Sequence, residues 1–132
     1  MRVRACFGLL LGLLVCAGCG KTKSTAELLA DLKGPHEKER IIAVRLLPQR
    51  KEDAAQVVPA LIEALKDKDV GVRQDAAIGL GSLGDLAIDA IPALQAAQHD
   101  RDARVREAAG VALSRIDPNL APKNTQGKAR GK

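Results

Sequence analysis

Aromatic side chains are nearly absent from this sequence. It has no Trp and no Tyr, and its single Phe, Phe7, lies in an apolar stretch near the N-terminus. Any core beyond that stretch must consist of Ala, Leu, Ile and Val, which suit closely packed helices. The composition therefore argues against an immunoglobulin-like sandwich, whose centre usually contains aromatic residues. It also lacks the aromatic platforms on which single-stranded nucleic acids stack their bases.

The middle of the chain has no surplus of positive charge, although the formal net charge of the whole chain is +5. Residues 24–116 contain 13 basic and 15 acidic side chains, so the basic surplus lies at the two ends. A nucleic-acid-binding domain normally gathers its Lys and Arg residues on one face. We therefore expect no nucleic-acid partner.

Cysteine occurs only near the N-terminus, at Cys6, Cys16 and Cys19. A thioredoxin-like pair needs a strand-to-helix context inside a folded domain, and a zinc half-site needs a second pair of ligands. Neither context surrounds Cys16 and Cys19. His36 and His99 are far apart in the sequence and form no metal motif. We therefore expect no metal and no other cofactor.

The first residues have the pattern of a secretory signal peptide. Arg2 and Arg4 precede residues 5–18, a run without charge that ends in small residues. This run is shorter than the roughly 20 residues that span a bilayer. A basic start, a short apolar stretch and small residues at its end are typical of a cleaved leader. A buried helix or a short membrane anchor is the alternative.

The tetrapeptide CAGC that closes this run resembles the signal of bacterial lipoproteins, in which small residues precede an invariant Cys. The resemblance implies a signal peptide over residues 1–18, and a lipidated Cys19 with a polar tether over residues 19–24. Cys16 departs from the Leu, Val or Ile that the family prefers, so cleavage after Ala17 by ordinary signal peptidase is an alternative. Two or more acyl chains would give stable attachment. We expect the protein in the bacterial cell envelope, lipid-anchored to an inner or outer membrane and facing the periplasm or exterior.

A 33-residue repeat fills the middle of the chain. The segment VPALIEALKDKDVGVRQDAAIGLGSLG, from Val58, aligns without a gap with IPALQAAQHDRDARVREAAGVALSRID, from Ile91. A weaker copy precedes them. We expect one domain over residues 25–117, with copies over residues 25–57, 58–90 and 91–117. A fixed period of this length indicates a solenoid of stacked units.

Each copy predicts two helices, because its apolar residues recur at helical spacing. In the second copy Asp69 is a good N-cap for the second helix, and Gly84 ends it. Asp102 and Pro118 take these roles in the third copy, and in the first copy Pro35 is expected at the first helical position. The apolar stripes of the second helices comprise Val72, Ala76, Leu80 and Leu83 in one copy and Val105, Ala109, Leu113 and Ile116 in the next.

These copies resemble the HEAT family, in particular the short HEAT-like repeats named after phycobilisome lyases, through the motif PALIEALKD-x-D-x-x-VR-x-x-AA-x-x-L. The resemblance implies an all-α fold, a short α-solenoid of about three HEAT-like helix pairs. In that family the turn Asp and the second-helix Arg form a structural polar ladder along the stack. The candidates for the ladder in this chain are Asp69 with Arg73 and Asp102 with Arg106.

The outer copies differ from the middle one. The first keeps Arg40 but has His36 at the position of the turn Asp, and the last has Gln95 and Gln98 where the second copy is apolar. Polar outer faces are typical of the terminal units of a short solenoid. Residues 118–132 contain Pro, Gly and basic residues with few apolar ones, and we expect a disordered basic tail there.

No catalytic motif accompanies the repeats. Ser82 lies in GLGSLGD, which superficially resembles a nucleophile motif. Its register, however, places it late in a repeat helix, at the position that Arg115 occupies in the next repeat. We predict a membrane-tethered, non-catalytic scaffold or adaptor that binds an unidentified protein and no small-molecule substrate. An accessory factor or lyase-like enzyme of the family, and a self-associating envelope protein, are the alternatives. The candidate contact residues, assigned by register on the second helices, are Arg45, Gln74, Ser82, Glu107 and Arg115.

Overall fold

The structure is a computed structural model that describes residues 22–120, and every regular element within them is helical. This confirms the predicted all-α fold. The α-helices are α1 (Thr25–Leu32), α2 (Glu37–Leu46), α3 (Ala54–Ala64), α4 (Val70–Leu83), α5 (Ile91–Ala97) and α6 (Ala103–Ile116). The 3-10 helices are η1 (Leu47–Gln49), η2 (Lys51–Asp53), η3 (Gly84–Ala90) and η4 (Pro118–Leu120). The predicted signal peptide, Cys19 and the tail from residue 121 lie outside the described residues.

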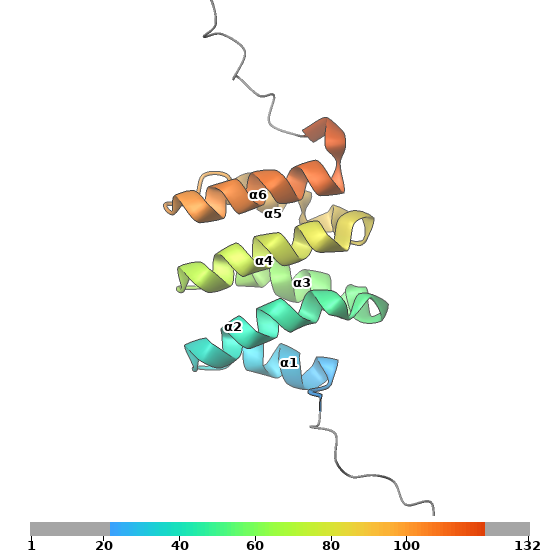
Figure 1. Ribbon diagram of the computed structural model, residues 1–132, viewed down its shortest axis with the longest axis vertical. Helices are drawn as coiled ribbons and strands as arrows, with labels where there is room; N and C mark the ends of the chain where they lie inside the picture. The colour runs from blue at the N-terminus through green and yellow to red at the C-terminus, as the bar shows by residue number, and fades with distance from the viewer. Residues whose placement is uncertain (1–21, 121–132) are drawn as a thin grey trace, which may run out of the picture.

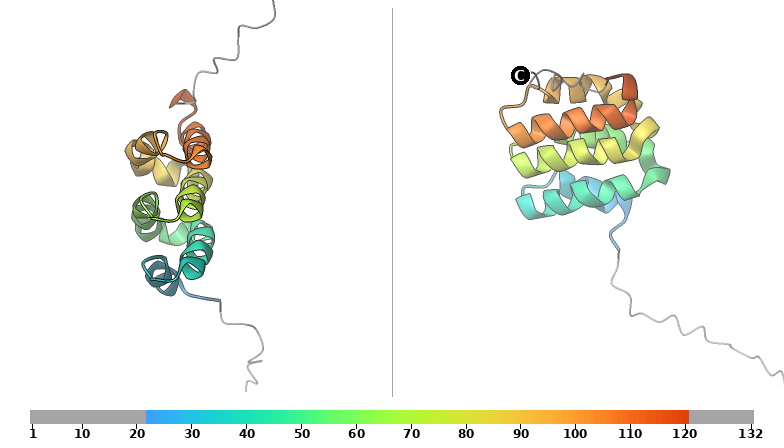
Figure 2. Two further views of the ribbon diagram at one scale, coloured as in Figure 1. Left: turned by 90° about the vertical axis from the view of Figure 1, so that its left-hand side faces the viewer. Right: turned by 45° about the horizontal axis from the view of Figure 1, so that its top comes forward.

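The helices stack as three pairs in two layers. Figure 1 shows α2, α4 and α6 as one row of nearly parallel helices, with α1, α3 and α5 behind them. The end-on view in Figure 2 separates the two rows. Each pair packs internally, α1 on α2, α3 on α4 and α5 on α6, and neighbouring second helices pack on one another. The structure is therefore the predicted short solenoid of HEAT-like helix pairs.

The core is built from the same repeat positions, 33 residues apart. Each first helix contributes one Leu that is almost completely buried. Each repeat contributes a second such Leu, in the second helix or, in the first repeat, directly after it. The six are Leu28, Leu61, Leu94, Leu47, Leu80 and Leu113. All eight residues of the two predicted apolar stripes are buried as well. Burial of a Leu side chain contributes about 1.5–3 kcal/mol. The aliphatic core thus extends without a break through all three pairs.

Side chains and one glycine set the helix ends. Asp69 and Asp102 cap α4 and α6 as predicted, because each side chain accepts a hydrogen bond from a first-turn backbone N–H. Gly84 ends α4 with a φ of 57°, a conformation that residues with a Cβ rarely adopt. The start of α1 was not predicted: Ser24 and Glu27 form a reciprocal capping box there.

The predicted start of α2 is wrong, and α3 extends beyond the predicted second copy. Pro35 is not the first residue of α2, which begins at Glu37 after His36. The carbonyl of Pro35 accepts a hydrogen bond from Arg40 instead, and this holds the residue in the preceding turn. The second repeat starts before residue 58, because α3 begins at Ala54 and contains Pro59 in its interior.

The first three residues of the predicted disordered tail form a short helix. Pro118–Leu120 form η4, which packs against α6. Leu120 is half-buried against the core, because an apolar side chain next to the open end of α6 gains by covering it.

One helical stretch, Val70–Ala97, has the length and composition of a membrane span, with a hydropathy of 1.4 in its most apolar window. It is not one straight helix. Gly84 and the non-helical backbone of Ala87 divide α4 from α5. The buried side chains of both helices belong to the solenoid core, which accounts for the high hydropathy of the stretch.

Candidate functional site

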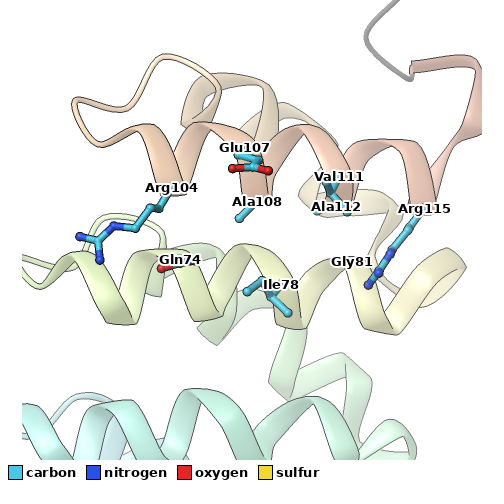
Figure 3. A pocket seen from close by; sticks show the side chains of 9 residues that line it. All are labelled: Gln74, Ile78, Gly81, Arg104, Glu107, Ala108, Val111, Ala112 and Arg115. Carbon is cyan, nitrogen blue, oxygen red and sulfur yellow. The ribbon is translucent and has the colours of Figure 1, made fainter. Parts of the chain in front are cut away.

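The exposed face of the second-helix row carries two grooves, of which the larger lies between α4 and α6. This α4/α6 groove has a volume of about 360 Å³. Figure 3 shows Gln74 and Ile78 along α4 facing Glu107 and Val111 along α6. Its lining residues are Gln74, Ile78, Gly81, Arg104, Glu107, Ala108, Val111, Ala112 and Arg115.

The floor of the α4/α6 groove consists of small residues that let the two helices approach closely. A Cβ on Gly81 would lie 2.8 Å from the Cα of Ala112 and 3.0 Å from its Cβ, closer than packed carbon atoms come. Ala108 and Ala112 are buried beneath the walls. The floor therefore consists of the helix backbone at Gly81 and alanine methyl groups, and the larger side chains on either side form the walls.

The walls of the α4/α6 groove combine exposed apolar and charged groups. Ile78 is 46% exposed and Val111 is 46% exposed, although both are aliphatic. Figure 3 shows Arg104 at one end of the groove and Arg115 at the other. Arg104 forms an ion pair with Asp102, and their hydrogen bond lowers the pKa of Asp102. The polar ends and apolar middle suit an elongated occupant with the same distribution.

A second groove, of about 200 Å³, lies between α2 and α4 and shares Ile78 with the first. Arg45 crosses it and donates from Nε to Asp75 at 2.6 Å. Ser82 also lines this α2/α4 groove, and its hydroxyl donates to the carbonyl of Gly79 within α4. The remaining lining residues are Val44, Pro48 and Gln49.

The structure distributes the five predicted contact residues over these two grooves. Gln74, Glu107 and Arg115 line the α4/α6 groove, while Arg45 and Ser82 line the α2/α4 groove. The register on the second helices therefore placed them on one continuous face. Sequence reasoning missed the exposed Ile78 and Val111 and the small floor residues. Ile78 and Val111 are equivalent in adjacent repeats, 33 residues apart, and that recurrence is the signal that could have identified them.

A ladder of arginine and aspartate runs along one edge of the stack. Arg40 donates from Nε and Nη2 to both carboxylate oxygens of Asp67, at 2.9 and 3.2 Å. Arg73 binds Asp100 in the same way, at 2.9 and 3.1 Å. Both arginines are almost fully buried. Each pair joins one repeat to the next, so the ladder holds the stack together.

The predicted acids of the ladder are wrong. Arg73 pairs with Asp100 and not with Asp69, whose side chain caps α4. Asp102 likewise caps α6, so its carboxylate is used within its own turn. An acid four residues before an arginine belongs to the same repeat. The acids observed in the ladder lie 27 residues after their arginines and therefore belong to the next repeat.

The ladder also includes the first repeat, in which His36 stands at the expected acid position. Arg40 obtains its carboxylate from Asp67 of the second repeat, so the identity of residue 36 does not matter for that pair. The equal spacing from Arg40 to Asp67 and from Arg73 to Asp100 is the sequence pattern that could have identified these pairs.

Carboxylate and imidazole groups lie apart from one another in the part of the chain that the structure describes. Among residues 22–120, no three His, Cys, Asp or Glu side chains gather in a way that could hold a metal ion. Glu107 and Asp75 are the carboxylates that line the two grooves, and His99 lines neither groove. What the face presents is exposed aliphatic side chains between two arginines.

Comparison with known proteins agrees with this architecture. A search of curated proteins found no match. A scan of protein families matches residues 25–114, about two thirds of the sequence, to the family described as HEAT repeats. The match spans the three helix pairs that carry both grooves and the ladder. On this combination of sequence match, stacked helix pairs and periodic core, the chain belongs to the HEAT repeat family.

Proposed function

We propose that this protein is a non-catalytic scaffold whose protein partner docks on the second-helix face. The observation that carries the proposal is the pair of adjacent grooves, which share Ile78 and are open to solvent over three successive second helices. HEAT repeats commonly act as protein-binding scaffolds, because stacked helices expose an elongated surface. Two large aliphatic side chains in the α4/α6 groove are more than a third exposed, Ile78 and Val111.

A protein is a better occupant than a small molecule for this face. Small-molecule sites are usually concave and bury most of their ligand. The two grooves here lie side by side along the helices and together suit an extended or helical segment. Exposed apolar groups rimmed by polar residues are typical of protein interaction sites.

We further propose that a lipid on Cys19 holds the scaffold on the outer side of a bacterial membrane. The support is the leader sequence and its CAGC end, which lie outside the described residues. Mass spectrometry of the N-terminus of the expressed protein tests this proposal. An acylated Cys19 is expected; a chain that begins at Gly18, or one that keeps the leader, would contradict it.

Crosslinking in native membranes with groove variants tests the docking surface. Gln74→Lys and Arg115→Glu change the charge on opposite walls of the α4/α6 groove, and both are expected to weaken capture of the crosslinked partner at least several-fold. Circular dichroism should be unchanged, because both side chains are at the surface.

Matched controls change the charge in the same direction outside the grooves. Gln56→Lys and Lys66→Glu alter exposed residues of the second repeat that line neither groove. They should capture the partner as the unmodified chain does. If the groove variants and the controls all retain the same proteins, the assignment of this face is wrong.

A further inference from the structure

The arginine ladder has an open end at Arg106. Nη1 of Arg106 donates to the carbonyls of Asp100 and Arg101, at 2.8 and 3.2 Å. Arg73 makes the equivalent contacts one repeat earlier, with Nη1 donating to the carbonyls of Asp67 and Lys68 at 2.9 and 3.3 Å. The backbone of the turn therefore holds the third guanidinium as it holds the second.

The difference lies at the other edge of the guanidinium. Arg40 and Arg73 each use Nε and Nη2 to bind both oxygens of an aspartate. Within residues 22–120, neither Nε nor Nη2 of Arg106 has a hydrogen-bond acceptor. Arg106 is exposed, whereas Arg40 and Arg73 are 4% and 5% exposed. The edge that takes a carboxylate in the two preceding repeats thus faces outward in the third.

The residues outside the described part of the given sequence include no aspartate or glutamate that could pair with Arg106. Residues 1–21 and 121–132 contain neither. A second copy stacked in the same register offers no acid either, because Gly34 stands where Asp67 and Asp100 stand in the later repeats. The ladder therefore begins without an acid and ends with an arginine, and no carboxylate among residues 22–120 binds the free edge of that arginine.

We propose that Arg106 is a binding site for an aspartate or glutamate side chain of a partner protein, which docks on the end of the stack as a further repeat would. The guanidinium fork matches a carboxylate with two parallel hydrogen bonds. The two carbonyl contacts already fix its orientation, so less side-chain freedom is lost on binding. This site is separate from the two grooves, and its failure would leave the proposed scaffold function intact.

The surroundings of Arg106 favour reversible docking over permanent stacking. The third repeat has Gln95 and Gln98 where the second has Ile62 and Leu65, of which Leu65 is buried. A polar end face does not need to be covered permanently, yet amide groups can form hydrogen bonds with a partner. The charged fork then supplies the specific contact on a face with little apolar surface.

A titration of the full chain, labelled with ¹⁵N and read at the arginine Nε–Hε signals, tests the site. The first probe is sodium acetate against sodium chloride at equal ionic strength. The second is a capped peptide that copies residues 95–106, whose turn presents Asp100, and its version with Asn at that position. Arg115, which is exposed in the same helix, is the internal control.

We expect the Arg106 signal to respond to acetate at a concentration at least three-fold lower than the Arg115 signal. The Asp peptide should shift the Arg106 signal at a still lower concentration, and the Asn peptide should require at least five-fold more. Arg106→Lys keeps the charge but loses the two parallel donors, and it should abolish the preference for the Asp peptide, read in this variant at the backbone amide signal of residue 106.

Three results would overturn the proposal. Equal responses of Arg106 and Arg115 to acetate would mean general ion pairing. Equal binding of the Asp and Asn peptides would mean that no carboxylate is recognised. A lower melting temperature of Arg106→Lys, with no response of Arg106 in the unmodified chain to either probe, would mean that this arginine only holds its own turn.

Discussion

At the scale of single residues, burial decides how much each arginine contributes. Arg73 is buried, and its guanidinium binds two carbonyls and a carboxylate. Arg45 forms an ion pair of similar length with Asp75, but 65% of its side chain is exposed to solvent. Removing one member of a buried pair leaves an uncompensated charge, whereas water screens an exposed pair.

We therefore expect very different effects from two substitutions of the same kind. Arg73→Ala should lower the free energy of unfolding by about 3–5 kcal/mol, because Asp100 and two carbonyls lose their partner. Arg45→Ala should change it by less than about 1 kcal/mol. Urea unfolding followed by circular dichroism measures both. Similar losses in the two variants would contradict the structural role given to the ladder.

The ladder also predicts sensitivity to acid. Hydrogen bonds from Arg73 hold the pKa of Asp100 below its ordinary value of 3.8. A lowered pKa in the folded state means that this carboxylate stabilises the fold above about pH 4 and that the contribution disappears as the pH falls through the folded-state pKa. Asp100→Asn should therefore be less stable than the unmodified chain at neutral pH, with a difference that shrinks below about pH 4.

Urea unfolding at a series of pH values measures that difference. Asp89→Asn is a suitable control, because Asp89 is exposed and has no ion pair among the described residues. It should follow the unmodified chain at each pH. A gap for Asp100→Asn that stays constant down to the acid transition would show that the loss has another cause than the carboxylate charge.

At the scale of helices, small residues set the separation of α4 and α6 and so create the groove. Gly81 on α4 lies directly against Ala112 on α6. Gly110, on α6, is different: the nearest atom to a Cβ placed there is Nε2 of Gln98, at an ordinary contact distance of 3.6 Å. The two glycines share a helical backbone and differ in what surrounds them.

Replacement of each glycine by Ala separates packing from helix propensity. Gly110→Ala should stabilise the protein by about 0.5–1 kcal/mol, because Ala favours the helix and fits. Gly81→Ala should instead destabilise it by about 1–3 kcal/mol, since the added methyl group forces α6 away. Thermal unfolding measures both variants. If both substitutions changed the stability in the same direction, the close approach at Gly81 would not be a determinant of the fold.

The helices also show which parts of the fold can be predicted from sequence. The 33-residue period and the apolar spacing predicted the buried stripes and the caps at Asp69 and Asp102, because both depend on local geometry. The start of α3 at Ala54 was not predicted, because the repeat was recognised only from Val58 onward. Pro59 lies inside α3, where a proline costs one hydrogen bond and can be tolerated by packing.

At the scale of the whole molecule, the three helix pairs share one core. Buried aliphatic residues from all three pairs form one continuous cluster, and each ladder pair bridges two repeats. A solenoid is stabilised by contacts between neighbouring units, and a short array of this kind is near the minimum for stability. We therefore expect that no single pair remains folded alone.

We therefore predict a single cooperative unfolding transition for the domain. The midpoints measured by circular dichroism and by scanning calorimetry should coincide, and the calorimetric and van't Hoff enthalpies should agree. Leu28→Ala in the first repeat and Leu94→Ala in the third each remove a buried side chain, and both should lower the one midpoint. Two resolved transitions, each affected by one of these variants, would contradict a shared core.

Only part of the candidate site was predictable from the sequence, because some of its features depend on contacts between repeats. The register of the repeats placed Gln74, Glu107 and Arg115 on one face, because position on a helix follows from sequence. The grooves depend on the distances between helices, which follow from contacts such as Gly81 with Ala112. The partners in the ladder, such as Asp100 for Arg73, come from the next repeat, so helical spacing within one repeat could not identify them.

The spacing of the ladder has a consequence for how such a chain can grow. If residues 58–90 were duplicated in tandem, Arg73 of the original unit would meet the inserted copy of Asp67, and the inserted Arg73 would meet Asp100. Every guanidinium except the last would keep its carboxylate, and the added leucines would continue the same buried rows. An insertion one residue shorter or longer would change the 27-residue interval of the pair that spans the altered position and break that pair. Length can therefore change in whole units of 33 residues without leaving a buried charge unmatched.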